Sequence, residues 1–194
     1  QRQPGSAFKP FIYSAALEKG FTPATIVNDA PFFVPADQTG SEDWEPKNYD
    51  GKFDGPMRIR AALARSKNLV TVRVMQAIGP QYAQDYIARF GFDPKLHPPY
   101  LTMALGAGSA TPMQMVSAYA IFANGGYRVA PYLIARIVDA KGNVLSEASP
   151  AEAGGTAERA IDPRNAWIMT SLLKDVVRVG TATRALSLNR ADLA

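Results

Sequence analysis

The sequence contains no cysteine and a single histidine, His97, among its 194 residues. A chain without cysteine forms no disulfide bond and offers no thiolate ligand to a metal ion. One histidine alone argues against a histidine-based metal centre and against a Ser-His-Asp catalytic triad. We therefore expect no metal site and no cofactor.

Long apolar runs are missing as well, since Arg73, Arg136 and the pair Gly125-Gly126 interrupt the longest candidates. None approaches the roughly 18 residues that a membrane helix needs. The net charge of +4 is not concentrated in a basic tail. The densest basic cluster comprises Arg58, Arg60, Arg65, Lys67 and Arg73. Without the interleaved aromatics of nucleic-acid modules, this cluster favours a carboxylate-bearing ligand or a solvated surface, and we expect no nucleic-acid partner.

The sequence does have an ordinary globular composition, 47% hydrophobic and 20% charged, in a length that suits one domain or a large piece of one. Its first residues, Gln1 to Gly5, include neither an initiator methionine nor the apolar core of a signal peptide. Its last residues, Ala191 to Ala194, carry no helix-stop or turn signal. We therefore expect a fragment of a longer gene product.

Apolar periodicity and boundary residues predict a mainly helical chain. Helices are expected over residues 6–19, 57–64, 69–77, 80–90, 112–122 and 163–179. The first of these is apolar enough to be buried, and it should begin at about Ser6 because Pro10 is tolerated only in the first helical turn. Thr111 and Gln114 form a capping-box pattern at the start of another.

The remaining segments predict loops and a few strands. Residues 28–56 are rich in Pro, Gly, Asp and Asn, which indicates a loop with at most short strands. The turn Lys141-Gly142-Asn143 separates two β-forming runs, so residues 132–138 and 144–146 are expected to form an antiparallel hairpin. The small residues of 148–157 predict an exposed loop.

Several conspicuous residues receive structural rather than chemical interpretations. Gly106-Ala107-Gly108 lacks the preceding strand and the third glycine of a phosphate-binding loop, so we expect a tight turn there. His97 precedes two prolines and is expected in a loop, while Trp44 and Trp167 are expected to contribute to packing. Four acidic residues without calcium-loop spacing are expected on a solvated surface: Asp43, Glu45, Asp50 and Asp54.

A Ser-x-x-Lys pattern, Ser6 to Lys9, stands at the start of the first predicted helix. Residues three apart share a helix face, so the lysine amine can reach the serine hydroxyl. An unperturbed lysine, with a pKa near 10.4, is a poor base at neutral pH, and a catalytic role therefore requires a crowded, partly buried Lys9. The alternative is an N-cap serine followed by a surface lysine.

A second pattern, Ser66-Lys67-Asn68, lies in a short polar loop between two predicted helices. Ser-x-x-Lys followed by a Ser-Asp-Asn type triplet and by Lys-Thr-Gly marks penicillin-binding proteins and class A β-lactamases. Two of these three motifs are present, and no Lys-Thr-Gly occurs in the 194 residues.

The sequence around both motifs resembles the transpeptidase domain of the class A, bifunctional penicillin-binding proteins. The resemblance rests on residues 2–11, 48–51, 60–68, 105–112 and 123–126. It implies an α/β fold of the α+β type, the serine penicillin-recognising (β-lactamase/transpeptidase-like) fold, with helices packed on an antiparallel sheet. Residues 1–194 would then form a fragment of one transpeptidase domain.

The resemblance also implies a chemistry, peptidoglycan D,D-transpeptidation. Ser6 would attack the D-Ala-D-Ala carbonyl of a stem peptide, and Lys9 would accept its proton. Ser66 would relay a proton to the leaving amine, and Asn68 would bind the substrate and help to hold Lys9. The backbone N–H of Ser6 would supply half of the oxyanion hole. β-Lactams would acylate the same serine, and a second stem peptide would resolve the acyl-enzyme to crosslink the cell wall.

Departures from the family pattern qualify these expectations. Lys67 stands where class A β-lactamases have Asp, which fits the bifunctional penicillin-binding proteins better. The only Leu-Asn pair, Leu188-Asn189, has Ala185 where a Glu-x-x-Leu-Asn motif needs its glutamate, so rapid β-lactam hydrolysis is disfavoured. We infer truncation before the Lys-Thr-Gly strand, and we expect the fragment alone to lack one wall of its site and to be inactive.

The family context implies further partners and a location. Peptidoglycan stem peptides and β-lactam antibiotics are the expected ligands, and a glycosyltransferase domain is expected upstream. An N-terminal anchor outside this sequence would hold the domain at the inner membrane, in the periplasm of the bacterial cell envelope. The alternative function is a non-catalytic penicillin-recognising module, such as a sensor or a scaffold.

Overall fold

The computed structural model describes residues 1–39, 42–190 and 192–193, so two of the four C-terminal residues considered above, Ala191 and Ala194, lie outside the described residues. The α-helices are α1 (Lys9–Glu18), α2 (Ala36–Thr39), α3 (Ile59–Ala64), α4 (Asn68–Ile78), α5 (Pro80–Ile87), α6 (Pro112–Ala123) and α7 (Pro163–Arg178). The strands are β1 (Ile26–Asp29), β2 (Gly55–Arg58), β3 (Tyr127–Arg128), β4 (Arg136–Val138), β5 (Val144–Glu147) and β6 (Glu158–Arg159).

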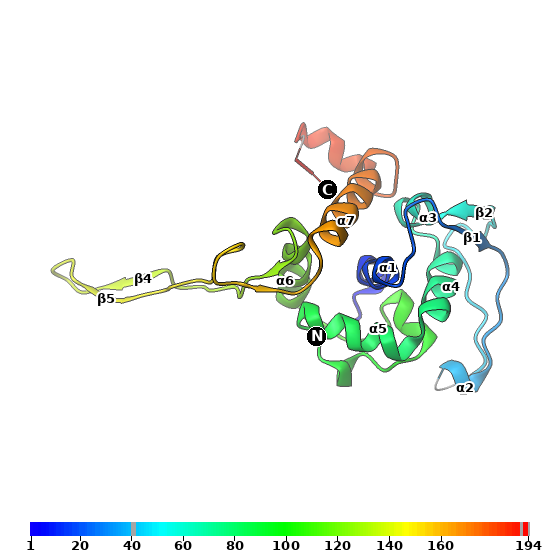
Figure 1. The fold of residues 1–194 in the computed structure, drawn as a ribbon, viewed down its shortest axis with the longest axis horizontal. Coiled ribbons are helices and arrows are strands. Elements are labelled where there is room, and N and C mark those ends of the chain that lie inside the picture. Colours follow the sequence, from blue (N-terminus) through cyan, green and yellow to red (C-terminus); the bar gives the residue numbers. More distant parts are fainter. Residues whose placement is uncertain (40–41, 191, 194) are drawn as a thin grey trace.

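Helix α1 lies at the centre of the helical body, as the sequence predicts for a helix that is apolar on every side (Figure 1). Its residues from Lys9 to Ala16 are buried, and it packs against α4, α5 and α7. An aromatic cluster surrounds its start, in which the ring of Phe11 contacts those of Phe8, Phe90, Phe92 and Phe122. The centre of the fold thus fixes the helix that begins with Lys9.

The backbone before α1 forms a 3-10 helix, η1 (Gly5–Phe8), and the regular α-helix begins three residues after the predicted start. Pro10 explains the difference. An α-helix starting at Ser6 would need the N–H of residue 10 to bond the Ser6 carbonyl, and proline has none. The N–H of Lys9 bonds that carbonyl instead, in the tighter 3-10 pattern.

Helices α1 and α7, far apart in the sequence, are joined by buried hydrogen bonds. The hydroxyl of Ser14 donates to the side-chain oxygen of Asn165 at 2.9 Å, and the amide nitrogen of Asn165 donates to the Ser14 carbonyl at 2.9 Å. Both residues are buried. The C-terminal helix therefore stabilises the helix that starts at the candidate nucleophile segment.

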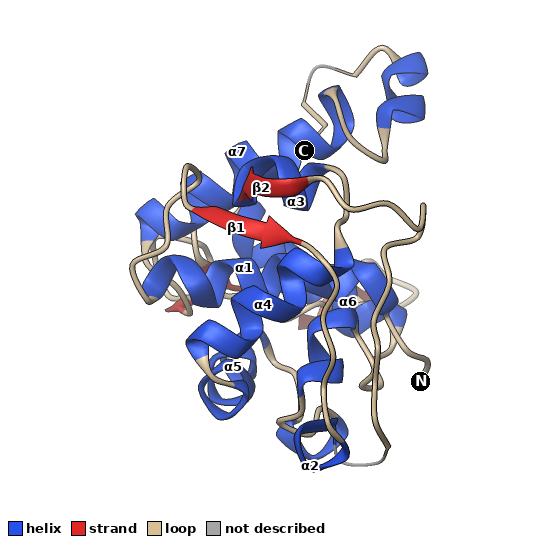
Figure 2. Ribbon diagram, turned by 90° about the vertical axis from the view of Figure 1, so that its right-hand side faces the viewer, coloured by secondary structure: helices blue, strands red, loops and turns tan. Residues whose placement is uncertain are grey.

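The strands described form separate two-stranded antiparallel sheets, β1 with β2, β3 with β6, and β4 with β5. Val27 pairs with Met57 in the first sheet, which lies beside α3 and α4 (Figure 2). The predicted helix over 57–64 is therefore wrong at its start, because Gly55–Arg58 is strand β2. Pairing with β1 explains this, because Met57 and Arg58 lie opposite Val27 and Ile26 and take the extended conformation of that ladder.

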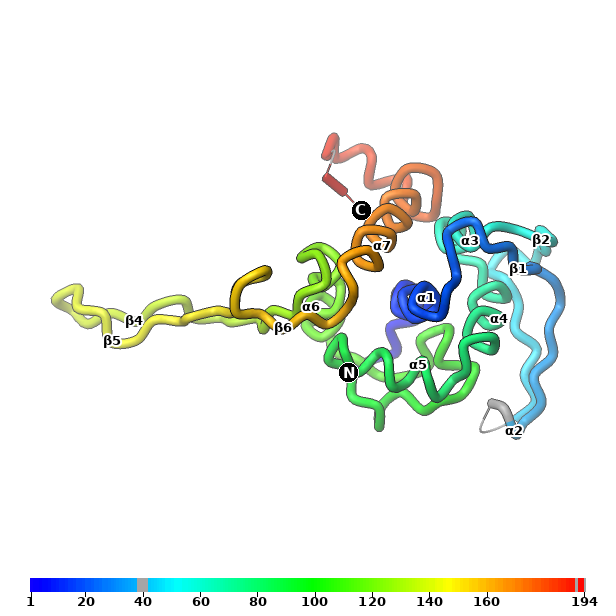
Figure 3. The backbone as a smooth tube through the Cα atoms, in the orientation of Figure 1, coloured from blue at the N-terminus to red at the C-terminus, as the bar shows by residue number. Residues whose placement is uncertain are grey.

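The predicted hairpin is confirmed, with shorter strands than expected at its start. Strands β4 and β5 pair across Ile137 and Ser146, and the Asp139 side chain accepts hydrogen bonds from the backbone N–H groups of Lys141 and Asn143 in the turn. The hairpin extends away from the helices and is exposed along both strands (Figure 3).

One of the structural expectations for single residues needs correction. Trp44 packs partly buried against the core as predicted, but Trp167 is 73% exposed on α7. His97 lies in a loop as predicted, after a short 3-10 turn, where it is buried and its ring stacks on that of Phe8 at 4.9 Å between centroids. The tight turn at Gly106 is confirmed by its left-handed backbone, with φ of 74°.

Candidate active site

The first residue of α1, Lys9, is a buried amine held entirely by neutral acceptors. Its Nζ donates to the Ser66 carbonyl at 2.7 Å, to Ser66 Oγ at 3.0 Å and to Asn68 Oδ1 at 2.6 Å. The residue is 1% exposed. The structure therefore excludes the surface-lysine alternative and brings Lys9, Ser66 and Asn68 together from both sequence motifs.

Burial changes the acidity of this amine. Desolvation lowers the pKa of Lys9 from its usual 10.5 to about 8, because removing the ammonium from water penalises the charged form. The three oxygens that it contacts are uncharged, so no carboxylate restores the usual value. A lysine with a pKa of about 8 is partly neutral at physiological pH and can then accept a proton.

The loop that carries Ser66 ends helix α3 in a Schellman arrangement. The N–H of Ser66 bonds the Leu63 carbonyl at 3.0 Å, and the N–H of Lys67 bonds the Ala62 carbonyl at 2.9 Å. Ser66 occupies the left-handed position of this motif, with φ of 54°, where glycine is usual. A serine in this strained backbone turns both its carbonyl and its hydroxyl oxygen toward Lys9.

Asn68 begins α4, and its amide group bridges two parts of the site. Its Oδ1 accepts from Lys9, and its Nδ2 donates to the Lys47 carbonyl at 2.8 Å. The Asn48 side chain in turn accepts from the Asn68 backbone N–H at 2.9 Å. The segment around Asn48 therefore fixes the start of α4 from outside the motif.

Lys67 points away from Lys9 into a cluster of carboxylates. Its Nζ lies 3.4 Å from Asp29, 3.3 Å from Asp50 and 3.0 Å from Asp54. Burial opposes its charge, but hydrogen bonds to Asp54 and Asp50 and the charge of Asp29 outweigh that effect and raise its pKa. Asp50 and Asp54 lie at the surface as predicted, with side chains that are 51% and 36% exposed, and their pairing with Lys67 was not predicted.

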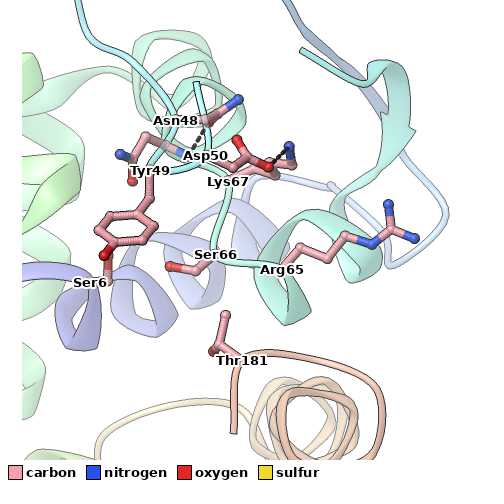
Figure 4. Close-up of a pocket in the computed structure, with 9 residues that line it drawn as sticks. Ser6, Asn48, Tyr49, Asp50, Arg65, Ser66, Lys67 and Thr181 are labelled. Carbon is pink, nitrogen blue, oxygen red and sulfur yellow. Dashed lines mark hydrogen bonds and ion pairs between the residues drawn. The ribbon is translucent and has the colours of Figure 1, made fainter. Parts of the chain in front are cut away.

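A pocket of about 300 Å³ opens in front of the two motifs (Figure 4). Its lining residues are Ser6, Asn48, Tyr49, Asp50, Arg65, Ser66, Lys67, Asn68 and Thr181. Ser6, Ser66 and Asn68 thus share one pocket, while Lys9 lies buried behind it. Among the described residues, the Ser6 hydroxyl has no hydrogen-bond partner, which leaves it free to approach a ligand.

Thr181 enters the pocket from the segment after α7, on the side opposite Ser66 in Figure 4. Its N–H bonds the Ala64 carbonyl at 3.1 Å, at the end of α3. Gly180 makes this approach possible, because a Cβ there would lie 2.2 Å from the same carbonyl oxygen. Sequence reasoning assigned no site role to Thr181, and its only signal was the glycine that ends the last helix.

The Gly106 turn packs directly against the segment that carries Ser6. A Cβ on Gly106 would lie 2.3 Å from the Gly5 carbonyl oxygen, and the Gly5 N–H bonds the Gly106 carbonyl at 3.4 Å. The β-bridge between Arg2 and Ala110 joins the same two segments. The predicted tight turn therefore also serves as the support behind the candidate nucleophile.

Neither metal binding nor membrane crossing is visible in the described parts of the chain. Their His, Asp and Glu side chains form no group of three that could hold a metal ion. None of the helices described is both long and apolar enough to cross a bilayer.

Comparison with known proteins places this geometry in a family. The family model for the penicillin-binding protein transpeptidase domain matches residues 1–191. Penicillin-binding protein 1A of Neisseria lactamica is 52% identical over 193 residues, which cover 100% of this chain and 24% of that protein. Penicillin-binding protein 1A of Pseudomonas aeruginosa is 42% identical over 239 residues, with coverage of 100% and 29%.

Solved structures agree with the sequence relatives. The crystal structure of penicillin-binding protein 1A from Haemophilus influenzae matches with a TM-score of 0.90 and 35% identity, over 97% of this chain and 33% of that one. PonA1 from Mycobacterium tuberculosis in complex with penicillin V matches with a TM-score of 0.75 and 27% identity, over 91% and 47%.

The chain spans about a quarter of the length of the Neisseria relatives that it matches. The match to the family model nevertheless covers nearly all of its residues, and the fold agrees with that of solved members. The resemblance inferred from the sequence is confirmed, and the chain belongs to the penicillin-binding protein transpeptidase domain family.

Proposed function

We propose that this chain supplies the acylation machinery of a peptidoglycan D,D-transpeptidase, with Ser6 as nucleophile and Lys9 as its general base. The observation that carries the proposal is the buried Lys9 amine, with a pKa lowered to about 8, behind a pocket that the Ser6 hydroxyl lines. A lysine with this pKa can accept a serine proton near neutral pH, which an exposed lysine does poorly.

In the proposed reaction Ser6 Oγ bonds to the penultimate D-Ala carbonyl carbon of a stem peptide, and the D-Ala-D-Ala amide bond breaks. The Ser6 proton passes to Lys9 Nζ. Ser66 Oγ, 3.0 Å from that nitrogen, relays a proton to the departing amine of the terminal D-Ala. The amine of a second stem peptide then displaces Ser6 and forms the crosslink.

Asn68 has a double role in this proposal. Its side-chain oxygen, 2.6 Å from Lys9 Nζ, holds the base in position. Its Nδ2 carries two hydrogens, of which one bonds the Lys47 carbonyl and the other remains for a substrate oxygen. The Ser6 backbone N–H would contribute to the oxyanion hole.

β-Lactams acylate the same hydroxyl in this proposal, because opening of the lactam ring also forms an acyl-serine and frees an amine. The family membership supports it, and the related PonA1 structure is a complex with penicillin V. A glycosyltransferase domain in the same full-length protein and a periplasmic location at the inner membrane belong to the proposal too, since relatives named penicillin-binding protein 1A are about four times as long as this chain.

Intact-mass measurement after incubation with penicillin tests the function directly. We expect the full-length protein to gain the mass of one penicillin, and peptide mapping to place the adduct on Ser6. Ser6→Ala should remove the adduct, while Ser146→Ala, an exposed serine in strand β5, should not. A folded full-length protein that forms no adduct would instead favour the non-catalytic penicillin-recognising module.

A further inference from the structure

A fully buried carboxylate, that of Asp29 at the end of β1, lies behind the loop from Ser66 to Asn68. Its side chain is 0% exposed, although it belongs to a segment 37 residues before Ser66. It is neither in the pocket lining nor in contact with Lys9. A buried carboxylate costs free energy unless it is paired and hydrogen-bonded. The partners of Asp29 therefore indicate which parts of the site it holds in place.

The two side-chain oxygens of Asp29 bind different partners around the loop. Oδ1 accepts from Asn48 Nδ2 at 2.7 Å, and Oδ2 lies 3.4 Å from Lys67 Nζ. Oδ2 also accepts from the Asp54 backbone N–H at 3.0 Å. One carboxylate therefore joins the ammonium group of Lys67 to the amide of Asn48.

Each of those partners controls one catalytic oxygen through the backbone. Lys67 is the residue between Ser66 and Asn68, so anchoring its side chain fixes the peptide units on both sides. Asn48 Oδ1 accepts from the N–H groups of Asn68 and Leu69, at 2.9 and 3.4 Å, and so fixes the first turn of α4.

We propose that Asp29 is a positioning residue of the acylation site, whose carboxylate holds Lys67 and Asn48 so that Ser66 and Asn68 present their oxygens to Lys9. This inference rests on the proposed function of Ser6 and Lys9. It explains why a strained left-handed serine persists at position 66: its neighbour Lys67 is tied to a buried anion.

The other carboxylates near Lys67 cannot do the same. Asp50 and Asp54 also pair with Lys67, but their side chains are 51% and 36% exposed, so water can replace them. Neither side chain is hydrogen-bonded to Asn48, whose side-chain amide donates to Asp29 and to the Lys52 carbonyl. Asp29 alone, among the described residues, joins Lys67 to Asn48.

The test measures acylation of the full-length protein by penicillin as a function of pH, for the wild type, Asp29→Asn and Asp54→Asn. In Asp29→Asn an NH₂ group faces Lys67, the loop moves, and the Lys9 amine loses acceptors that favour its charged form. We expect the plateau rate to fall about 100-fold and the pH midpoint to drop about one unit below that of the wild type.

Asp54→Asn is the matched control, because it removes a carboxylate from the same ammonium group at an exposed position. We expect its plateau rate within about threefold of the wild type and an unchanged midpoint. Tyr13, which lies near Asp29, stays neutral throughout because burial raises its pKa. The pH midpoint of acylation therefore reflects the titration of Lys9 and not that of Tyr13.

A purely structural Asp29 gives a different result. Asp29→Asn would then lower the thermal unfolding midpoint but leave the acylation midpoint unchanged, which overturns the inference while wild-type acylation still supports the proposed function. If the wild type itself is not acylated, both fail. Should Asp29→Asn not fold, Lys67→Met replaces it, and an unchanged pH midpoint in that variant overturns the inference as well.

Discussion

The amine nitrogen of Lys9 lies 2.6 Å from the side-chain oxygen of Asn68, although 59 positions separate the two residues. The acceptor is an amide and not a carboxylate. An amide orients the amine without fixing its charge, whereas a carboxylate at this distance would keep it protonated. The choice of asparagine therefore matters as much as its position.

Asn68→Asp should favour the charged form of the Lys9 amine. The new carboxylate would raise the pKa of Lys9 above about 8, so the pH midpoint of penicillin acylation should move to higher pH and the rate at pH 7 should fall at least about tenfold. Acylation rates measured over pH 6 to 10 would give both the midpoint and the rate at pH 7. Asn189→Asp, an exposed change of the same type, controls for added charge, and an unmoved midpoint in Asn68→Asp would contradict the base assignment.

The wild-type pH profile is a prediction in its own right. Because Lys9 must be neutral to accept the Ser6 proton, the acylation rate should rise as pH increases through about 8 and then level off. The single histidine does not produce this rise, since burial lowers the pKa of His97 below its usual value. A flat profile between pH 7 and 9 would exclude Lys9 as the base.

Lys9→Arg should retain the positive charge and lose most of the acylation by penicillin. A guanidinium group stays protonated at every accessible pH, so it cannot take the serine proton. We expect acylation to fall by about 100-fold or more. The comparison with Lys19→Arg, at the exposed end of α1, separates this loss from a general effect of arginine, and near-normal acylation of Lys9→Arg would leave the amine a purely electrostatic role.

Gly106→Ala should displace the backbone segment that carries the candidate nucleophile, Ser6. Its Cβ would clash with the Gly5 carbonyl oxygen, displacing the turn that carries Ser6. We expect a stability loss of about 3 kcal/mol and slower acylation. Gly142→Ala has the same left-handed strain with open space around its Cβ, so it should cost only about 1 kcal/mol and leave acylation unchanged. Calorimetry and acylation rates compare the pair.

Local sequence signals predicted most of the helices. The capping box of Thr111 and Gln114 forms as expected, and α7 begins at Pro163 with Asp162 as its cap. These features depend on neighbours in the chain. Strand β2 was missed because its pairing with β1 is a contact between distant segments, which overrode the apolar pattern after Met57.

In the candidate site, too, features that depend on local sequence were predicted and contacts between distant segments were not. Ser6, Lys9, Ser66 and Asn68 were identified by short motifs, and the burial of Lys9 was required by its proposed chemistry. The ion cluster of Lys67 was not predicted, because nothing in the local spacing of Asp29 or Asp54 shows that they converge on one lysine. Thr181 lines the pocket because the backbone at Gly180 lies close to the Ala64 carbonyl, which only the structure reveals.

The hydrogen bond between Ser14 and Asn165 can form only late in the synthesis of the chain. The two residues are 151 positions apart, and a ribosome adding roughly 5–20 residues per second needs on the order of ten seconds to bridge that gap. Until then Ser14 lacks its two hydrogen bonds with Asn165, and of its buried partners only the hydroxyl of Tyr86, 72 positions away, has been synthesised. The helix that begins with Lys9 therefore reaches its full set of buried hydrogen bonds only after Asn165 has left the ribosome.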